Sequence, residues 1–174
     1  NKDIKWYLSD ESLWITKHKE YTEIEERIGM SVVGSFNCLY EGNDTVLFNK
    51  ENGEFETAII NLLEIHTSTL EEVNLPIKNK QRGDLIFKDK DYCNFVFQSS
   101  AIYIKAQDAL IALPVNLKEK EYTILFIVED FAFLICDNQL EGWILKNASN
   151  YVYPSHINIS EETEMVSDNN QDLL

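Results

Sequence analysis

The first ~30 residues carry apolar side chains at helical spacing. The spacing between successive apolar residues is three or four positions, or about twice that, and charged residues lie between them. These apolar residues are Leu13, Tyr21, Ile24 and Ile28. Serines at positions 9 and 12 stand before this stretch, where serine is favoured as an N-cap, and a glycine at position 29 suits the end of a helix. The pattern therefore predicts an N-terminal helix.

From residue 31 onward the pattern becomes that of strands. Phe36, Cys38 and Tyr40 alternate with other residues and lead into a turn cluster at 41–44, after which a second apolar run begins. Asn52-Gly53 follows, which is the strongest short signal for a β-hairpin. Residues 55–65 then carry apolar side chains at both odd and even positions, which predicts a strand with its middle buried on both sides. Residues 68–71 form a capping-box pattern for a short helical turn.

Residues 74–83 contain a proline and a local group of basic side chains at positions 78, 80 and 82. A solvated connector explains this composition better than a binding patch does. The segment is the best candidate for an internal boundary.

The second half of the chain consists of short apolar runs separated by turn-forming residues, which predicts successive strands. The predicted strands cover residues 84–87, 93–97, 101–105, 110–115, 122–128, 131–136, 142–145 and 151–153. Such spacing is typical of a barrel or a sandwich. The last residues, 160–174, are acidic with little to bury, which predicts one frayed helical turn followed by a flexible tail.

The expected fold class is therefore mainly β with an N-terminal helix (α+β), built as an antiparallel barrel or sandwich. The predicted regions are a helix plus hairpin region at 1–75, a barrel-like region at 83–155 and an acidic tail at 156–174. Two small packed β subdomains and one continuous domain both fit this pattern.

Charge is the strongest global signal, because 30 Asp and Glu face only 15 Lys and Arg and the net charge is -15. Phosphate contacts need clustered cations, so nucleic acid and anionic membranes are not expected partners. No apolar run reaches the ~18 residues that a membrane helix requires. A surface of this kind attracts basic proteins and speeds their encounter, although solubility alone would also explain the excess of carboxylates.

The cysteines and asparagines point to different compartments. Cys38, Cys93 and Cys136 leave one thiol over after any pairing and lie among apolar residues, which favours a reduced intracellular setting. Sequons at Asn43, Asn147 and Asn158 keep a secreted origin open.

Residues 123–152 contain four features in a fixed order. A hydrophobic strand runs into an acidic turn, a second strand ends at Asp137-Asn138, and the segments 141–144 (Glu-Gly-Trp-Ile) and 149–152 (Ser-Asn-Tyr-Val) follow. This order resembles the last three strands of an SH3 domain and implies an SH3-like barrel. The segment at 112–116 lacks both aromatics of the family's Ala-Leu-Tyr-Asp-Tyr opening, and only Tyr151 matches the aromatic groove. Since proline-rich ligands dock between stacked aromatics, proline-rich recognition is not expected.

No set of residues forms a recognisable catalytic or cofactor motif. His18, His66 and His156 lie far apart and none has a second ligand at metal-binding spacing. Cys136 precedes Asp137, which would raise the pKa of the thiol and disfavour a reactive thiolate. With only 6 glycines and no glycine-rich motif, a phosphate loop is not expected. We therefore expect no enzyme activity, cofactor or metal; a carboxylate hydrolase has no positive support.

Two functions fit the sequence. The first is a non-enzymatic acidic module, similar to inhibitor or immunity proteins, that binds a basic protein partner. The second is an SH3-like or PH-like docking domain excised from a larger regulatory or scaffold protein, suggested by a first residue other than Met. The candidate partner-binding residues are Glu129, Asp130, Glu141, Trp143 and Tyr151. The pattern gives no oligomeric state.

Overall fold

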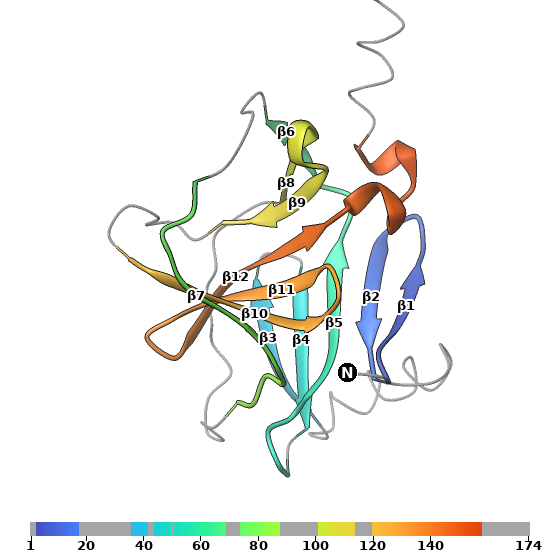
Figure 1. Cartoon of the computed structure of the whole chain (residues 1–174). Coiled ribbons are helices and arrows are strands. Elements are labelled where there is room, and N and C mark those ends of the chain that lie inside the picture. The colour runs from blue at the N-terminus through green and yellow to red at the C-terminus, as the bar shows by residue number, and fades with distance from the viewer. Residues whose placement is uncertain are drawn as a thin grey trace, which may run out of the picture.

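A computed structural model describes residues 3–17, 36–41, 44–49, 51–68, 74–87, 101–113 and 120–157. These residues form two β-sheets, which Figure 1 shows lying one behind the other. The first sheet has five antiparallel strands in the order β1-β2-β5-β4-β3. Its strands are β1 (Lys5–Leu8), β2 (Ser12–Thr16), β5 (Phe55–Asn61), β4 (Asp44–Asn49) and β3 (Phe36–Glu41).

The second sheet has seven strands in the order β6-β8-β9-β12-β11-β10-β7. Its strands are β6 (His66–Ser68), β8 (Ala101–Ile104), β9 (Ala109–Ala112), β12 (Gln139–Lys146), β11 (Phe131–Cys136), β10 (Tyr122–Val128) and β7 (Ile77–Arg82). The five middle strands are antiparallel, whereas β6 and β7 add in parallel at the two edges. Among the described residues, three short 3₁₀ segments follow β8 and β12: η1 (Lys105–Gln107), η3 (Ala148–Asn150) and η4 (Pro154–Ile157).

The main core lies between the two sheets. Leu13, Phe48 and Phe55 from the first sheet join Phe133 and Trp143 from the second in one cluster of buried side chains. The rings of Phe55 and Phe133 meet edge to face, with centroids 5.8 Å apart. The sheets thus pack as a sandwich, which decides between the barrel and the sandwich expected from the sequence. The cluster includes side chains from both predicted regions, 1–75 and 83–155, and their division into folding units stays a prediction.

A second buried cluster lies on the other face of the seven-stranded sheet. It includes Ile111, Tyr122, Leu134 and Ile144. Because β11 contributes alternate residues to both clusters, five of its six residues are buried. Burial on both faces explains why residues 131–136 form a continuous hydrophobic run instead of alternating with polar residues.

The predicted N-terminal helix is wrong for the residues that the structure describes. Strands β1 and β2 form a hairpin here, and β2 also pairs with β5. The serines expected as helix caps instead close the hairpin turn, since the Ser9 amide donates to the Ser12 carbonyl (2.9 Å) and the Ser12 amide donates to Ser9 Oγ (3.1 Å). Serine serves turns and caps by the same short-range hydrogen bonds. The apolar residues at 21–28 lie outside the described residues.

Two further elements differ from the expectation. The expected solvated connector at 74–83 contains strand β7, which polar residues form by pairing with β10. The expected strand at 151–153 is a turn between η3 and η4. Residues 84–87 contribute a single bridge, Glu54 to Ile86, in place of a strand. The expected strand at 93–97, the helical turn after residue 68 and the acidic tail from residue 158 onward fall outside the described residues, whereas residues 156 and 157 of the expected tail belong to η4.

The expected Asn52-Gly53 hairpin is confirmed between β4 and β5. The Gly53 amide donates to the Asn49 carbonyl (2.8 Å), and Gly53 has a φ of 73°. A Cβ at this position would overlap the carbonyl oxygen of Phe87, whose amide donates to the Gly53 carbonyl (2.7 Å). Glycine is therefore required both by the backbone conformation and by the close approach of residue 87.

Candidate functional site

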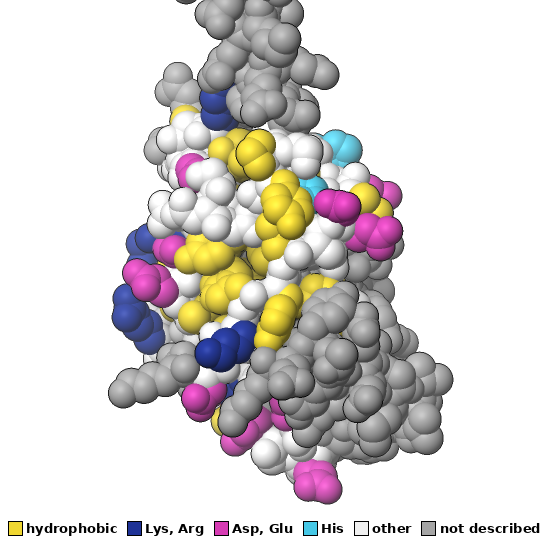
Figure 2. Space-filling view, turned by 90° about the vertical axis from the view of Figure 1, so that its right-hand side faces the viewer, with side chains coloured by type: hydrophobic (Ala, Val, Ile, Leu, Met, Phe, Trp, Pro, Cys, Tyr) yellow, Lys and Arg dark blue, Asp and Glu magenta, His cyan; other side chains and the backbone are white. Residues whose placement is uncertain are grey.

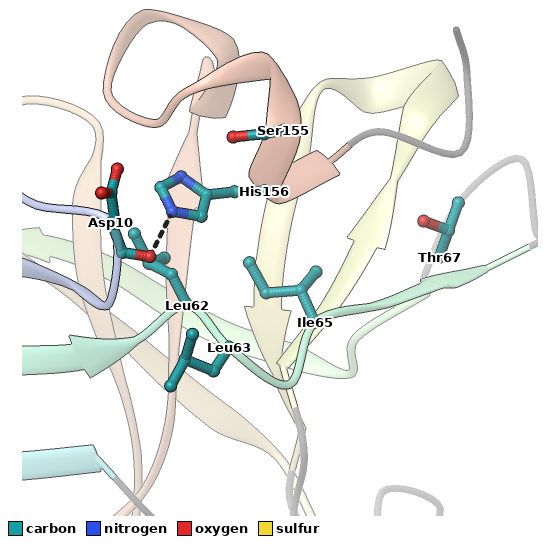
Figure 3. A pocket seen from close by; sticks show the side chains of 7 residues that line it. All are labelled: Asp10, Leu62, Leu63, Ile65, Thr67, Ser155 and His156. Carbon is teal, nitrogen blue, oxygen red and sulfur yellow. Dashed lines mark hydrogen bonds between the residues drawn. The ribbon is translucent and has the colours of Figure 1, made fainter. Parts of the chain in front are cut away.

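A groove lies at the end of the sandwich where η4 meets the β1–β2 turn. We call it the His156 groove; its volume is about 430 Å³. Its lining residues come from the β1–β2 turn, the β5–β6 connection, β6 and η4, as Figure 3 shows. They are Asp10, Leu62, Leu63, Ile65, Thr67, Ser155 and His156.

Backbone hydrogen bonds fix the floor of the groove. The Leu62 amide donates to the Glu11 carbonyl (2.9 Å), which ties the end of β5 to the hairpin turn. The next amide, that of Leu63, donates to Asn61 Oδ1 (2.7 Å), so the chain turns sharply here. Leu62 points inward and is buried, while 65% of Leu63 is exposed. The turn therefore presents one leucine to the core and the next to solvent.

His156 connects η4 to the hairpin turn. Its Nδ1 accepts a hydrogen bond from the Tyr153 amide (3.1 Å), so the ring proton lies on Nε2, which donates to the Asp10 carbonyl (2.9 Å, Figure 3). The ring also stacks on Tyr153, with centroids 5.5 Å apart. Both ring nitrogens thus form hydrogen bonds to the main chain, and His156 connects η4 to the β1–β2 turn at the rim of the groove.

Aspartate, histidine and serine side chains all line this groove, yet they do not form a catalytic triad. His156 contacts the main-chain carbonyl of Asp10 and not its carboxylate. Its other nitrogen is occupied by a backbone amide, so it cannot accept a proton from the Ser155 hydroxyl. Figure 3 shows these three side chains pointing in different directions. The arrangement gives no activated nucleophile.

The charges around the groove are negative. Asp10 lines it, and the exposed carboxylates of Glu11 and Glu64 are the sequence neighbours of lining residues. No lysine or arginine is among the lining residues. Figure 2 shows histidine and acidic side chains close together on one side of this face, with exposed hydrophobic side chains nearby. The groove thus combines an exposed apolar side chain with an acidic rim.

The structure brings together three of the residues predicted to bind a partner. The Tyr151 hydroxyl donates to Asp130 Oδ2 (2.6 Å), and the Asn147 side-chain amide donates to Asp130 Oδ1 (3.0 Å). Trp6 stacks on Tyr151 with centroids 4.2 Å apart. Burial and then the Asp130 carboxylate raise the pKa of Tyr151 to about 12. Glu129 lies beside Asp130 and is exposed, so of the three it is the most available to a partner.

The other two predicted residues lie elsewhere. Glu141 pairs with Lys120 (2.8 Å), with 13% of its side chain exposed. Trp143 is 2% exposed and belongs to the core between the sheets, so its side chain cannot contact a partner in the folded protein. A tryptophan after glycine in a strand gives no indication in the sequence of which face it occupies. The five residues do not share one surface.

Sequence reasoning missed the residue that Trp143 contacts. Asp44 is 8% exposed, and its Oδ2 accepts a hydrogen bond from Trp143 Nε1 (2.9 Å) across the space between the sheets. Its Oδ1 accepts from the Asn61 amide (2.7 Å). Burial raises the pKa of Asp44 to about 6, although both hydrogen bonds oppose the rise. The sequence presents this aspartate as an ordinary turn residue, so no local signal could have revealed its burial.

A second polar cluster lies on the seven-stranded sheet near the β11–β12 turn. Burial, followed by the charges of Asp137 and Glu141, raises the pKa of the Cys136 thiol. Burial and the Glu141 carboxylate also raise the pKa of the Tyr122 hydroxyl. The expected effect of Asp137 on Cys136 is confirmed in direction, and the thiolate that nucleophilic chemistry needs is disfavoured.

Within the described residues, no group of three or more His, Cys, Asp and Glu side chains converges to hold a metal ion. In the same part of the chain, no helix has the length and apolar character needed to cross a bilayer. His66 is exposed at the start of β6, His18 lies outside the described residues, and Cys136 is a buried free thiol. No protein-family model matches the chain, and a search of curated proteins finds no match.

Proposed function

We propose that the protein is a non-enzymatic binding module that engages a basic protein partner through the His156 groove. The observation that carries this proposal is the exposure of Leu63: 65% of this leucine faces solvent at a groove with an acidic rim. Among described residues it is the most exposed large hydrophobic side chain. Exposed apolar patches rimmed by polar residues mark interaction sites, and Leu63 shares this groove with the partly exposed Ile65.

The energetic argument combines an apolar anchor with charge. Covering the exposed part of Leu63 would contribute about 1–2 kcal/mol, since full burial of a leucine side chain is worth about 1.5–3 kcal/mol. The carboxylates of Asp10, Glu11 and Glu64, together with the net charge of -15, favour a partner surface rich in Lys and Arg. Such complementarity mainly raises the association rate, so binding should weaken as ionic strength increases.

The groove also has the rigidity that a binding site needs. Its rim is held by the hydrogen bond between His156 and the Asp10 carbonyl and by that between the Leu62 amide and the Glu11 carbonyl. A partner would therefore meet a preformed surface and lose less free energy to ordering it.

The proposal can be tested by site-specific photocrosslinking in the cells that produce the protein. A photoreactive phenylalanine analogue replaces Leu63 in one variant and Ile86, which is 52% exposed on another part of the surface, in the control. We expect a basic protein to be crosslinked at position 63 and not at position 86. Identical products at both positions, or an acidic product at position 63, would refute the proposal.

The identified partner then allows a quantitative test. Leu63→Ser should weaken binding by about 5- to 30-fold, which corresponds to the 1–2 kcal/mol above, while Ile86→Ser should leave the affinity within about twofold. Binding should also weaken between low and high salt. Affinity that is independent of both Leu63 and ionic strength would show that this groove is not the interface.

A further inference from the structure

Strand β7 is an exposed edge that the proposed function does not use. All six residues of Ile77–Arg82 are exposed. The strand ends the seven-stranded sheet and pairs with β10 on one side, with Lys80 opposite Ile124 and Arg82 opposite Phe126. Among the described residues, no other strand pairs with it. Within the described residues, the amide and carbonyl groups on its outer edge therefore have no strand to pair with.

This edge is basic in a strongly acidic protein. Lys80 and Arg82 occupy alternate positions of β7, so their side chains leave the strand on one face, whereas Lys78 lies at a shift in the register with β10. None of them forms an ion pair with a carboxylate of the described residues, where the recorded pairs are Lys17 with Asp84 and Lys120 with Glu141. These three cations, which have no ion-pair partner among the described residues, stand close together in a chain with a net charge of -15.

A groove of about 310 Å³ continues from this face of β7 toward β12. Lys80, Arg82 and Lys146 contribute cations to its lining, and Lys146 Nζ lies 5.8 Å from the centroid of the Phe126 ring, which also lines it. An anionic side chain projecting from an added strand would enter a space already lined by cations and by an aromatic ring.

Two carboxylates, Glu129 and Asp130, line the same groove. Asp130 is already engaged, because its oxygens accept hydrogen bonds from Tyr151 and Asn147. These donors are neutral groups, so both carboxylates of the lining oppose an incoming anion, against the three cations of Lys80, Arg82 and Lys146. Cations remain in excess on this surface.

We propose that β7 accepts an extended acidic segment of a partner protein as an additional strand. Main-chain hydrogen bonds to the outer edge would hold the segment, and carboxylates at every second residue would meet Lys80 and Arg82. This inference is independent of the His156 groove, since it concerns another surface and a partner of opposite charge. The competing explanation is that the lysines protect the edge against association, as charged residues on edge strands do.

The test is a titration of the full-length, ¹⁵N-labelled protein with a capped seven-residue peptide of alternating Glu and Val. We expect the amide resonances of β7 and β10 to shift. A peptide of alternating Lys and Val should cause no such shifts. A third peptide has the same acidic sequence but is N-methylated at alternate residues along one edge, so it keeps the charges and loses the main-chain donors of that edge. It should bind at least about tenfold more weakly than the unmethylated acidic peptide. Equal binding of the methylated peptide would overturn the strand addition.

Charge variants complete the test. Lys80→Glu should weaken binding of the acidic peptide by about tenfold, whereas Lys5→Glu, an exposed substitution with the same change of charge on β1, should change it by less than about twofold. Both variants should retain the native amide spectrum. If the acidic peptide does not bind and Lys80→Ser instead makes the protein self-associate, the lysines only protect the edge. Leu63→Ser separates the two proposals, because it should not affect binding of this peptide.

Discussion

Asp44 should make the stability of the protein fall as the pH rises through 6. Burial raises the pKa of Asp44 from 3.8 to about 6 in the folded protein. Since one pKa unit corresponds to ~1.36 kcal/mol, the folded state gains about 3 kcal/mol from protonated Asp44 at low pH. This gain is fully present below the unfolded-state pKa and is lost as the pH rises through the folded-state pKa. The folded state binds the carboxyl proton of Asp44 more tightly than the unfolded state does, so the contribution of Asp44 to stability decreases with rising pH.

The measurement should stay above the isoelectric point of ≈ 4.5, where the protein carries little net charge. Between pH 5 and pH 7.5 the linkage relation gives a loss of about 1.4 kcal/mol from Asp44 alone. Other groups also contribute to the pH dependence of the wild type. The informative quantity is therefore the difference between the wild type and Asp44→Asn, in which other, distant groups cancel.

Asp44→Asn removes the titration and keeps the size of the side chain. Its single carbonyl oxygen can accept from either the Asn61 amide or Trp143 Nε1, and its NH₂ then faces the other donor. This mismatch costs about 1–3 kcal/mol and does not depend on pH. The free energy of unfolding of the variant minus that of the wild type should therefore be about 1.4 kcal/mol more favourable at pH 7.5 than at pH 5.

Urea unfolding at the two pH values, followed by tryptophan fluorescence, measures this difference. Asp3→Asn, at an exposed position, controls for the loss of one negative charge. In the wild type, the Nε1–H resonance of Trp143, assigned by its loss in Trp143→Phe, should titrate with a midpoint near 6 because it reports the charge on its acceptor. Parallel changes in the stability of wild type and Asp44→Asn between the two pH values would refute the reasoning.

Two other substitutions test contacts with matched controls. Gly53→Ala should lower the free energy of unfolding by at least about 2 kcal/mol because of the positive φ and the overlap with a carbonyl. Its control is Gly83→Ala, which has space for a Cβ and should change the free energy of unfolding by less than about 0.5 kcal/mol. Equal urea midpoints for the two variants would contradict this. Tyr151→Phe removes the hydrogen bond to Asp130 and should cost about 1.5–3 kcal/mol in the same assay, compared with Tyr153→Phe at an exposed position. A Tyr151→Phe protein as stable as the Tyr153→Phe control would show that this bond contributes nothing.

The strands that could be predicted from the sequence are those whose local pattern and tertiary burial agree. Residues 122–128 and 131–136 are apolar, are separated by an acidic turn, and form β10 and β11 with these bounds. Asn52-Gly53 predicted its hairpin because a positive φ is a local requirement that glycine meets. In these cases the few residues around a position contain all the information that is needed.

The errors arise where partners distant in sequence decide the structure. Leu13, Trp14 and Ile15 fit a helix face as well as a strand, and pairing with β5 decides the outcome. Strand β7 has no apolar alternation at all, because its pairing with β10 forms it and its side chains remain in solvent. Periodicity reports on burial, so a fully exposed strand gives no signal.

The same limit applies to the candidate site. The His156 groove joins a turn near residue 10 to residues 62–67 and 155–156, and no spacing rule relates these positions. The hydrogen bond between Asp44 and Trp143 also links residues that only the packing of two sheets brings together. By contrast, the proximity of Asp130 and Tyr151 reflects their places at the ends of neighbouring segments, β11 and η3.

The edge positions of β6 and β7 constrain the order of assembly. The two strands are neighbours in the sequence, yet they occupy opposite ends of the seven-stranded sheet and both pair in parallel with strands that come later in the chain. A chain growing from its N-terminus therefore emits both strands before either acceptor, β8 or β10, exists. During synthesis β6 therefore has no acceptor until β8 is made and β7 has none until β10 is made, and the basic sequence of β7 suits a strand that stays in solvent during this time.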